Sequence, residues 1–312
     1  MRNRPRIFID GEHGTTGLQI RSRLAGRDDI EIISIPTERR KDPAARADFL
    51  NAADVAILCL PDDAAKESVS LIANDTTKVI DASSAHRVAD GWAYGFAEMD
   101  RAQAKAIASA KRVANPGCWP QGPIGGLRPL IAAGLLPADY PVTMSGISGY
   151  SGGGRSMIED YERRGDAAPG FFPYGLTFQH KHVPELKMYS GVSRTPMMVP
   201  AVGNFAQGMV TIVPLQLGEL GKVPSGRQLH AALADHYAGI EAGSVEVAPY
   251  VEAERLPELD PEAHNDTNTM RLYVFANDRR AQAALVAVYD NLGKGASGAA
   301  VQNLDLMIGS GD

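Results

Sequence analysis

Cys118 has the residue type and the setting of a nucleophile. It stands in the turn Asn115-Pro-Gly-Cys118-Trp-Pro, and the apolar stretch 121–133 that follows has the composition of a helix. A thiolate at the start of a helix is stabilised by the helix dipole and by backbone N–H groups, which favours the ionised, reactive form. The alternative is a Pro-Gly-Cys turn that serves packing alone.

A base for this nucleophile is expected in the motif His180-Lys-His182-Val-Pro-Glu185, which holds the one cluster among the seven histidines. If the segment is extended, His180 and His182 share one face of it. Imidazole titrates near neutral pH, so one of the two could donate and accept a proton while the other binds substrate or orients its partner. A structural pair and a metal site are the alternatives. No metal is predicted, because two histidines with no evident third ligand do not complete a metal site.

A glycine motif near the N-terminus has the placement of a dinucleotide-binding loop. Residues 10–17 read DGEHGTTG, which spaces the glycines as G-x-x-G-x-x-G between an apolar run and a helix-like stretch. Glycine permits a tight turn there, and a helix N-terminus offers free N–H groups to a pyrophosphate. A plain glycine turn is the alternative. The predicted cofactor-binding residues of this loop are Gly11, Gly14, Thr15, Thr16 and Gly17.

Three consecutive cations, Arg39, Arg40 and Lys41, follow the second apolar run of the chain. An NAD site places a carboxylate near this point to accept the ribose 2′-hydroxyl, whereas cations suit the 2′-phosphate of NADP. The cations therefore favour NADP. Glu38 leaves NAD open, and a solvated basic turn is the alternative to either.

Two further loops have the composition of anion sites. Residues 146–155 combine hydroxyl groups, flexible glycine backbone and an arginine, and residues 81–87 offer the same ingredients. Such groups suit a phosphorylated or carboxylated small-molecule substrate. Ordinary Gly/Ser loops are the alternative. The predicted substrate-binding residues are Arg87, Ser148, Gly149 and Arg155, together with Glu185 of the histidine motif.

The elements that must position the glycine loop alternate along the first 115 residues. Strands are expected at residues 6–10, 30–35, 55–60 and 78–81. Helices are expected between them at 18–24, 44–53 and 62–74. Strict alternation of strand and helix predicts βαβ units, and therefore an α/β domain with a Rossmann-like parallel sheet.

The pattern changes after Asn115 to longer strands separated by longer stretches. Strands are expected at 142–147, 209–217 and 269–275, and helices at 226–237, 281–292 and 299–307. The second half is therefore predicted to be an α+β domain with a mixed or mostly antiparallel sheet.

Composition excludes several classes of protein. The chain has 312 residues, 44% of them apolar, and a net charge of −6, which disfavours nucleic acid and anionic membranes as partners. No apolar run approaches the roughly 18 residues of a membrane span, and the N-terminus lacks a signal-peptide core. Two cysteines cannot form a disulfide framework, so a cytoplasmic location is expected. Cys59 lies in an apolar run and is predicted to be a buried structural thiol.

Five motifs, in the order in which they occur along the chain, resemble those of a known family. They are the Cys118 turn, the Gly/Ser loop 148–155, the histidine motif, GNFAQG at 203–208 and DNLGKGASGAA at 290–300. With them the chain resembles the N-acetyl-gamma-glutamyl-phosphate reductases of the short, second type, within the aspartate-semialdehyde dehydrogenase superfamily. The resemblance implies reduction of N-acetyl-glutamyl 5-phosphate to N-acetyl-glutamate 5-semialdehyde with NADPH, in arginine biosynthesis, through a thioester on Cys118.

The resemblance also implies a domain organisation. We expect an NADP-binding domain at 1–117 with a returning C-terminal segment at 285–312, and a catalytic and dimerisation domain at 118–284. A homo-oligomer, dimer or tetramer, is expected. In the closing segment Asn291 is assigned to the cofactor and Lys294 to cofactor or phosphate, with a helix-breaking loop as the alternative.

Two other functions remain open from the sequence. A sister enzyme that acts on another acyl phosphate, such as aspartyl phosphate, would share the nucleophile and the cofactor chemistry. A dinucleotide-sensing protein without turnover would need neither Cys118 nor the His180 and His182 pair.

Overall fold

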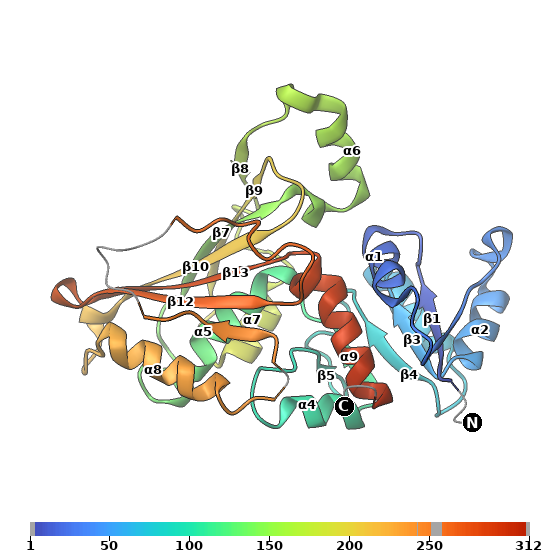
Figure 1. Ribbon diagram of the computed structural model, residues 1–312, viewed down its shortest axis with the longest axis horizontal. Coiled ribbons are helices and arrows are strands. Elements are labelled where there is room, and N and C mark those ends of the chain that lie inside the picture. Colours follow the sequence, from blue (N-terminus) through green and yellow to red (C-terminus); the bar gives the residue numbers. More distant parts are fainter. Residues whose placement is uncertain (1–3, 242, 251–257, 310–312) are drawn as a thin grey trace. The chain divides into compact units, whose positions relative to one another are not determined.

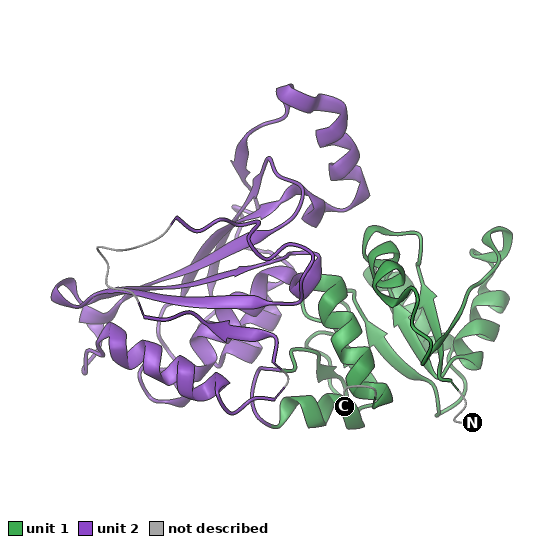
Figure 2. Ribbon diagram, in the orientation of Figure 1, with its two compact units in different colours: residues 1–97, 102–117, 296–312 green, residues 98–101, 118–295 purple. Residues whose placement is uncertain are grey.

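The structure is a computed structural model that describes residues 4–241, 243–250 and 258–309. The chain divides into two compact units (Figure 2). Unit 1 comprises the chain up to Ala97, Ala102–Gly117 and the segment from Ala296 on. Unit 2 comprises Glu98–Arg101 and Cys118–Gly295.

Unit 1 is built on a parallel sheet, which confirms the expected Rossmann-like class. Within the described residues the sheet has six strands in the order β2-β1-β3-β4-β6-β5, and every pairing is parallel. The strands are β1 (Arg6–Asp10), β2 (Glu31–Ile33), β3 (Val55–Leu58), β4 (Lys78–Asp81), β5 (Ala93–Tyr94) and β6 (Arg112–Ala114). The helices are α1 (Thr15–Leu24), α2 (Pro43–Ala52), α3 (Asp62–Leu71), α4 (Gln103–Ser109) and α9 (Gly298–Ile308).

Strand β3 is apolar along its whole length, and β1 and β4 are apolar between their charged end residues, because both faces of the sheet are covered. All four residues of β3 are buried, as are the last four of β1. Phe8, Leu50 and Val79 bring β1, α2 and β4 into one core cluster. Helix α2 begins where the sequence provides a start signal, with Pro43 as its first residue and the Asp42 side chain accepting the Ala44 N–H at 3.0 Å.

The C-terminal helix α9 belongs to unit 1 (Figure 1). It packs against α1 and α4, and Asn303 donates hydrogen bonds to the Gly95 carbonyl and to Asn115 Oδ1, both at 3.0 Å. The returning segment starts at Ala296. The expected boundary at residue 285 falls inside a strand of unit 2, so residues 285–295 lie in the other unit.

Unit 2 carries a mixed sheet, as expected. Its described residues form seven strands in the order β11-β12-β13-β10-β7-β9-β8, with parallel pairing only between β11 and β12 and between β7 and β9. The strands are β7 (Thr143–Gly149), β8 (Phe171–Pro173), β9 (Met197–Gly203), β10 (Met209–Gln216), β11 (Val245–Val247), β12 (Met270–Asn277) and β13 (Gln282–Tyr289). The helices are α5 (Cys118–Ala132), α6 (Arg155–Arg164), α7 (Val183–Ser190) and α8 (Gly226–Tyr237).

Helices α5 and α8 pack on this sheet, and α7 packs on α5, whereas α6 lies beyond the β8–β9 edge (Figure 1). The start of α8 is encoded by a capping box in which Ser225 and Gln228 bond each other's backbone N–H groups. Among the described helices, none is long and apolar enough to cross a membrane.

One expected helix is wrong. Residues 281–292 are rich in alanine, but residues 282–289 form strand β13, which pairs along all eight residues with β10 on one side and β12 on the other. Pairing with two neighbours outweighs the helix propensity of alanine. Small residues suit this central strand because α5 approaches it closely, and a Cβ on Gly122 would lie 2.8 Å from the Ala287 Cβ.

Candidate active site

Cys118 is the first residue of α5, so the helix begins one turn earlier than the stretch expected from the sequence. The side chain is partly exposed, and the first turn of α5 carries no acidic residue to oppose an anion. Its neighbour is Gly295, where an added Cβ would lie 2.8 Å from the Cys118 Cβ. The Gly-Lys-Gly sequence of the closing motif thus gives the nucleophile its space.

Tyr289, at the end of β13, contacts the first turn of α5. Its hydroxyl donates to the Cys118 carbonyl at 2.6 Å and accepts the Gly122 N–H at 3.3 Å. Burial, and after it the charge of Cys118, raises the pKa of Tyr289 well above its usual range. Tyr289 was not predicted as a site residue, because β13 was expected to be a helix.

Tyr174 connects the nucleophile to the histidine motif. Burial raises its pKa, and the charge of Cys118 raises it further, against the effect of a hydrogen bond with Trp119. Its ring lies 5.8 Å from the His180 ring, edge to face. Cys118, Tyr174 and His180 therefore lie in one cluster within unit 2.

The histidine motif is a turn rather than the extended segment we expected. His182 caps the N-terminus of α7, and its backbone N–H donates to His180 Nδ1 at 3.2 Å. The two rings nevertheless lie 4.7 Å apart, edge to face. Because Nδ1 of His180 is an acceptor, the proton of its neutral ring is on Nε2, where it can be donated. Pro184 in the first turn of α7 explains why the segment turns here.

Glu185 lies in the first turn of α7 and is 1% exposed. Its charge, after burial, raises the pKa of Tyr189 to about 12 and also contributes to the raised pKa of Tyr289. The carboxylate thus lies in the same buried cluster as the residues around Cys118. Whether it contacts the substrate stays a prediction.

The Gly/Ser loop is tied into unit 2 by its backbone. Gly149 donates its N–H to the Gly208 carbonyl at 2.9 Å, and Ser148 beside it is 3% exposed. Asn291 bonds the same loop, with Nδ2 donating to Ser151 Oγ at 3.0 Å and Oδ1 accepting the Gly208 N–H at 2.8 Å. These contacts give Asn291 a structural task in unit 2, whereas the other predicted cofactor-binding residues belong to unit 1.

Lys294 is fully buried, and its ammonium donates to Glu98 Oε2 and to Ser244 Oγ, each at 2.7 Å. Burial lowers its pKa, although the charge of Glu98 opposes this effect. The ammonium is therefore committed to a buried ion pair. This argues against the contact with cofactor or phosphate expected for Lys294.

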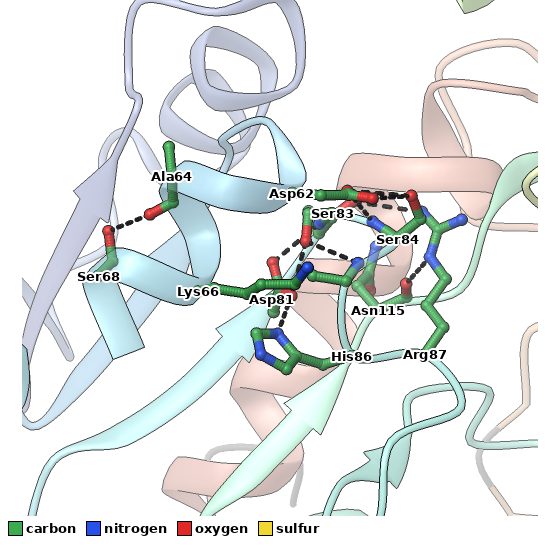
Figure 3. Close-up of polar contacts among 12 residues, drawn as sticks. Asp62, Ala64, Lys66, Ser68, Asp81, Ser83, Ser84, His86, Arg87 and Asn115 are labelled. Carbon is green, nitrogen blue, oxygen red and sulfur yellow. Dashed lines mark hydrogen bonds and ion pairs between the residues drawn. The ribbon is translucent and has the colours of Figure 1, made fainter. Parts of the chain in front are cut away.

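The two predicted substrate arginines have different settings. Arg155 is the first residue of α6 and follows Gly154, which has a φ of 74°. Arg87, in unit 1, is 8% exposed and donates to the backbone carbonyls of Asn115 at 3.1 Å and Ala82 at 3.3 Å (Figure 3). Arg87 therefore holds the loop that follows β4.

The same loop contains a buried polar cluster that the sequence did not indicate. Asp81 is fully buried and receives the Ser83 hydroxyl at 2.8 Å and His86 Nδ1 at 2.6 Å (Figure 3). The His86 ring stacks on Trp92 with centroids 4.1 Å apart. Ser83 bonds the Asp81 carboxylate rather than His86, so the three residues are not arranged to activate a serine nucleophile. The cluster instead orders the end of β4.

The glycine loop of unit 1 has steric reasons for its glycines. Gly11 has a φ of 89°, and a Cβ there would overlap the Cys59 carbonyl. A Cβ on Gly17 would overlap the Gly11 carbonyl. Gly14 caps α1 without a side chain, so the first-turn N–H groups of α1, which include those of Thr15 and Thr16, have no side-chain acceptor at that cap.

A crevice of about 380 Å³ opens at this loop. The residues that line it include Gly11 and Gly14 of the loop, Arg40 and Lys41 after β2, and Leu60 after β3. Arg39 does not line it and instead bonds Asp42 at 3.2 Å, which lowers the pKa of that carboxyl. Glycine backbone, a helix N-terminus and two cations in one crevice fit the phosphates of a dinucleotide.

Three residues missed by the sequence analysis meet at the end of β2. Arg21 donates to Ser34 Oγ at 2.8 Å and pairs with the buried carboxylate of Glu12, which also accepts the Ser34 hydroxyl at 3.1 Å. Dinucleotide-binding folds place the residue that recognises the ribose at this point. Arg21 is far from it in sequence, so only the fold brings the three together.

Cys59 is partly exposed, as Cys118 is, but the surroundings of its sulfur differ. Burial, and after it the charges of Asp81 and Asp10, raises the pKa of Cys59 to about 12. The thiol is therefore protonated at neutral pH. Within the described ranges no group of three or more His, Cys, Asp or Glu side chains is arranged to hold a metal ion.

Comparisons with known proteins match two parts of the chain to semialdehyde dehydrogenase family models. A family model described as "Semialdehyde dehydrogenase, dimerisation domain" matches residues 118–291, and one described as "Semialdehyde dehydrogenase, NAD binding domain" matches residues 31–107. The second match and the glycine loop together support a nicotinamide dinucleotide as cofactor.

The fold is similar to that of aspartate semialdehyde dehydrogenase II complexed with ASA from Vibrio cholerae, with a TM-score of 0.75 over 99% of this chain and 100% of that chain. It is also similar to aspartate semialdehyde dehydrogenase with NADP from Candida albicans, with a TM-score of 0.67 over 98% and 99%. The sequence identities are 15% and 12%, so these likenesses concern the fold alone.

Sequence identity to a curated relative is far higher. The chain is 76% identical over 303 residues, 97% of this chain and 98% of the relative, to N-acetyl-gamma-glutamyl-phosphate reductase of Chelativorans sp. (strain BNC1). At this identity over nearly the whole length, the chain belongs to the N-acetyl-gamma-glutamyl-phosphate reductases, oxidoreductases of the semialdehyde dehydrogenase family.

Proposed function

We propose that the protein reduces N-acetyl-L-glutamyl 5-phosphate to N-acetyl-L-glutamate 5-semialdehyde and phosphate with NADPH, as a step of arginine biosynthesis. The observation that carries the proposal is Cys118 at an unopposed helix N-terminus, with Tyr174 linking it to His180 in the same unit. The names of the relatives supply the substrate.

The nucleophile accounts for the first step. The Cys118 thiolate attacks the acyl carbon, the carbon–oxygen bond to phosphate breaks, and phosphate leaves with the bonding electrons. The product is a thioester on Cys118. When bound, the dinucleotide supplies the hydride that reduces this thioester to a thiohemiacetal.

His180 is proposed to move the proton. Its Nε2–H donates to the oxygen as the thiohemiacetal forms, and the same nitrogen takes the proton back when the carbon–sulfur bond breaks. That break releases the aldehyde and returns Cys118 as thiolate. His182, which is 5% exposed and fixes His180 Nδ1 through its backbone N–H, is the second candidate.

NADP rather than NAD is the proposed cofactor. Gly11, Gly14 and the first-turn N–H groups of α1 would hold the pyrophosphate, and Arg40 and Lys41 would face the 2′-phosphate, because both line the crevice. Arg39, bonded to Asp42, is the least suited of the three cations.

The substrate is tested with the purified enzyme in the oxidative direction. We expect phosphate-dependent reduction of NADP⁺ with N-acetyl-L-glutamate 5-semialdehyde, with a kcat/KM at least about 100-fold above that for L-aspartate 4-semialdehyde. A preference for aspartate semialdehyde would contradict the substrate. Binding of NADP⁺ without turnover of either aldehyde would support the dinucleotide-sensing alternative.

We also propose a homodimer that packs through the face of the unit 2 sheet turned away from α5. Val210, Val286 and Val288 form a buried cluster on that face, and Ile212, which lies on the same face, is 36% exposed and available to a second copy of the chain. Light scattering is expected to show that Ile212→Arg yields monomers, whereas Val223→Arg, at an exposed position in a loop, leaves the dimer intact. Equal masses for both variants would contradict this interface.

A cytoplasmic location is proposed on the same grounds as from the sequence. Cys59 and Cys118 are both free thiols, which suits a reducing compartment, and the proposed mechanism requires Cys118 to stay reduced. Recovery of the protein in the periplasmic fraction of fractionated cells would contradict it.

A further inference from the structure

Helix α5 is irregular, and two tyrosines compensate for it. Pro129 has no N–H to donate to the carbonyl of Gly125, four residues earlier. The Tyr237 hydroxyl donates to that carbonyl instead, at 2.9 Å. This tyrosine therefore serves as an external partner for a helix carbonyl that a proline has left without its donor.

Tyr289 makes the corresponding contact at the first turn, where Pro123 follows Gly122 inside the helix. Gly122 has an N–H, which in a regular helix would donate directly to the carbonyl of Cys118. The Tyr289 hydroxyl stands between the two groups, 2.6 Å from the Cys118 oxygen and 3.3 Å from the Gly122 nitrogen. A buried hydroxyl thus bridges the backbone groups that bracket the first turn.

The direction of these hydrogen bonds is determined by their partners. The Gly122 N–H can only donate and the Cys118 carbonyl can only accept, so the Tyr289 hydroxyl accepts from the first and donates to the second. The phenol proton is therefore committed to the Cys118 carbonyl. Tyr289 is fully buried, so its ring cannot swing away.

We propose that Tyr289 is a positioning residue, whose hydroxyl holds the Cys118 carbonyl and thereby sets the place and orientation of the nucleophilic sulfur. The proposal rests on the proposed role of Cys118. Gly295 bounds the same residue, with its Cα against the Cys118 side chain. Between them, these two residues leave Cys118 little freedom to move.

A phenol suits this task because it stays neutral. Its raised pKa keeps the proton on Tyr289 over the working pH range, so it always donates and never places a second negative charge beside the thiolate. A bonded carbonyl also presents less negative charge to the thiolate, which favours ionisation of Cys118.

The test compares Tyr289→Phe with Tyr237→Phe, which removes the same kind of bond from the same helix two turns away. For Tyr289→Phe we expect kcat to fall about 10- to 100-fold with little change in the aldehyde KM. The pH midpoint for alkylation of Cys118 by iodoacetamide should rise by about 0.5 unit or more. Tyr237→Phe should lower the melting temperature, with kcat and the midpoint as in wild type.

If Tyr289→Phe has the kcat and the Cys118 alkylation midpoint of wild type, Tyr289 serves packing alone and the proposal is wrong. If that variant does not fold, Thr211→Val keeps the ring and removes one donor to its hydroxyl, and a smaller rise of the midpoint is expected; no rise would overturn the proposal. The parallel variant Cys118→Ser separates the two claims. Retained turnover in Cys118→Ser contradicts the proposed function, whereas normal turnover in Tyr289→Phe beside an inactive Cys118→Ser contradicts the positioning role alone.

Discussion

The two cysteines of this protein stand in nearly the same local sequence and have opposite surroundings. Cys59 and Cys118 are each separated by one residue from a proline at the entry to a helix. Helix α3 begins only after that proline, with Asp62 and Asp63 in its first turn, so Cys59 remains at the end of a strand. Helix α5 begins at Cys118 itself and has no acid in its first turn.

This shift in where the helix begins changes the electrostatics of the thiol. Cys59 is surrounded by Asp10 and Asp81 and has a pKa of about 12. Cys118 lies near Tyr174 and Tyr289, both kept protonated by burial, and the Glu185 carboxylate belongs to the same buried cluster. Reactivity therefore follows from the position of the helix start and from the charges around it, not from the residue type.

The largest expected effect comes from exchanging each thiol for a hydroxyl. Cys118→Ser should lower kcat by at least about 10³-fold, since the nucleophile is lost, whereas Cys59→Ser should stay within about two-fold of wild type. Steady-state rates of NADP⁺ reduction with the semialdehyde and phosphate measure both.

Alkylation provides a control in the same molecule. At pH 8 a thiol with a pKa of about 12 is ionised to only about one part in 10⁴, so iodoacetamide should label Cys118 and leave Cys59 intact. Labelling of Cys59 should rise about tenfold per pH unit, because its pKa lies above the accessible range. Equal labelling of both thiols at pH 8 would remove the contrast.

The histidine pair is the next difference to test. His180→Ala should lower kcat about 100-fold, and His182→Ala less, because His180 presents a protonated Nε2 whereas His182 holds it through a backbone N–H that survives the substitution. The reverse order would exchange their roles. Melting temperatures of both variants exclude loss of folding as the cause.

Space around the nucleophile gives the third effect. Gly295→Ala places a Cβ 2.8 Å from the Cys118 Cβ, so the cysteine must shift, and we expect kcat to fall about 10- to 50-fold. Gly170→Ala, at a glycine of the same unit with open space around it, should have no effect. Equal kcat values for the two variants would show that Cys118 tolerates displacement.

The sequence predicted the features that are determined by neighbouring residues, namely several strand limits and the turn before the helix of Cys118. The alternation of apolar runs and helices placed β1 and β4 at their observed limits, and the breakers around Cys118 indicated a turn before a helix. Alanine content misassigned β13, because pairing with β10 and β12 is invisible in a local window. Tyr289 was lost with that strand.

Contacts between segments that are distant in the chain could not be predicted from the sequence either. Lys294 was expected to meet a ligand, but its partner Glu98 lies nearly two hundred residues earlier in the chain. A charged side chain in a glycine-rich segment is compatible with a ligand or with a buried ion pair, and only the fold decides between them.

The smallest effect separates binding from reaction. If unit 1 holds the dinucleotide and unit 2 carries the chemistry, replacing both Arg40 and Lys41 with alanine should raise the KM for NADPH about tenfold, leave the KM for NADH within about two-fold and change kcat little. Arg39→Ala is the matched control, because its guanidinium bonds Asp42 rather than lining the crevice, and it should change neither KM. Equal increases of the KM for NADPH and for NADH would mean that the cations form a solvated turn and do not recognise the 2′-phosphate. A fall in kcat with unchanged KM would mean that the crevice lined by Arg40 and Lys41 takes part in the reaction as well as in binding.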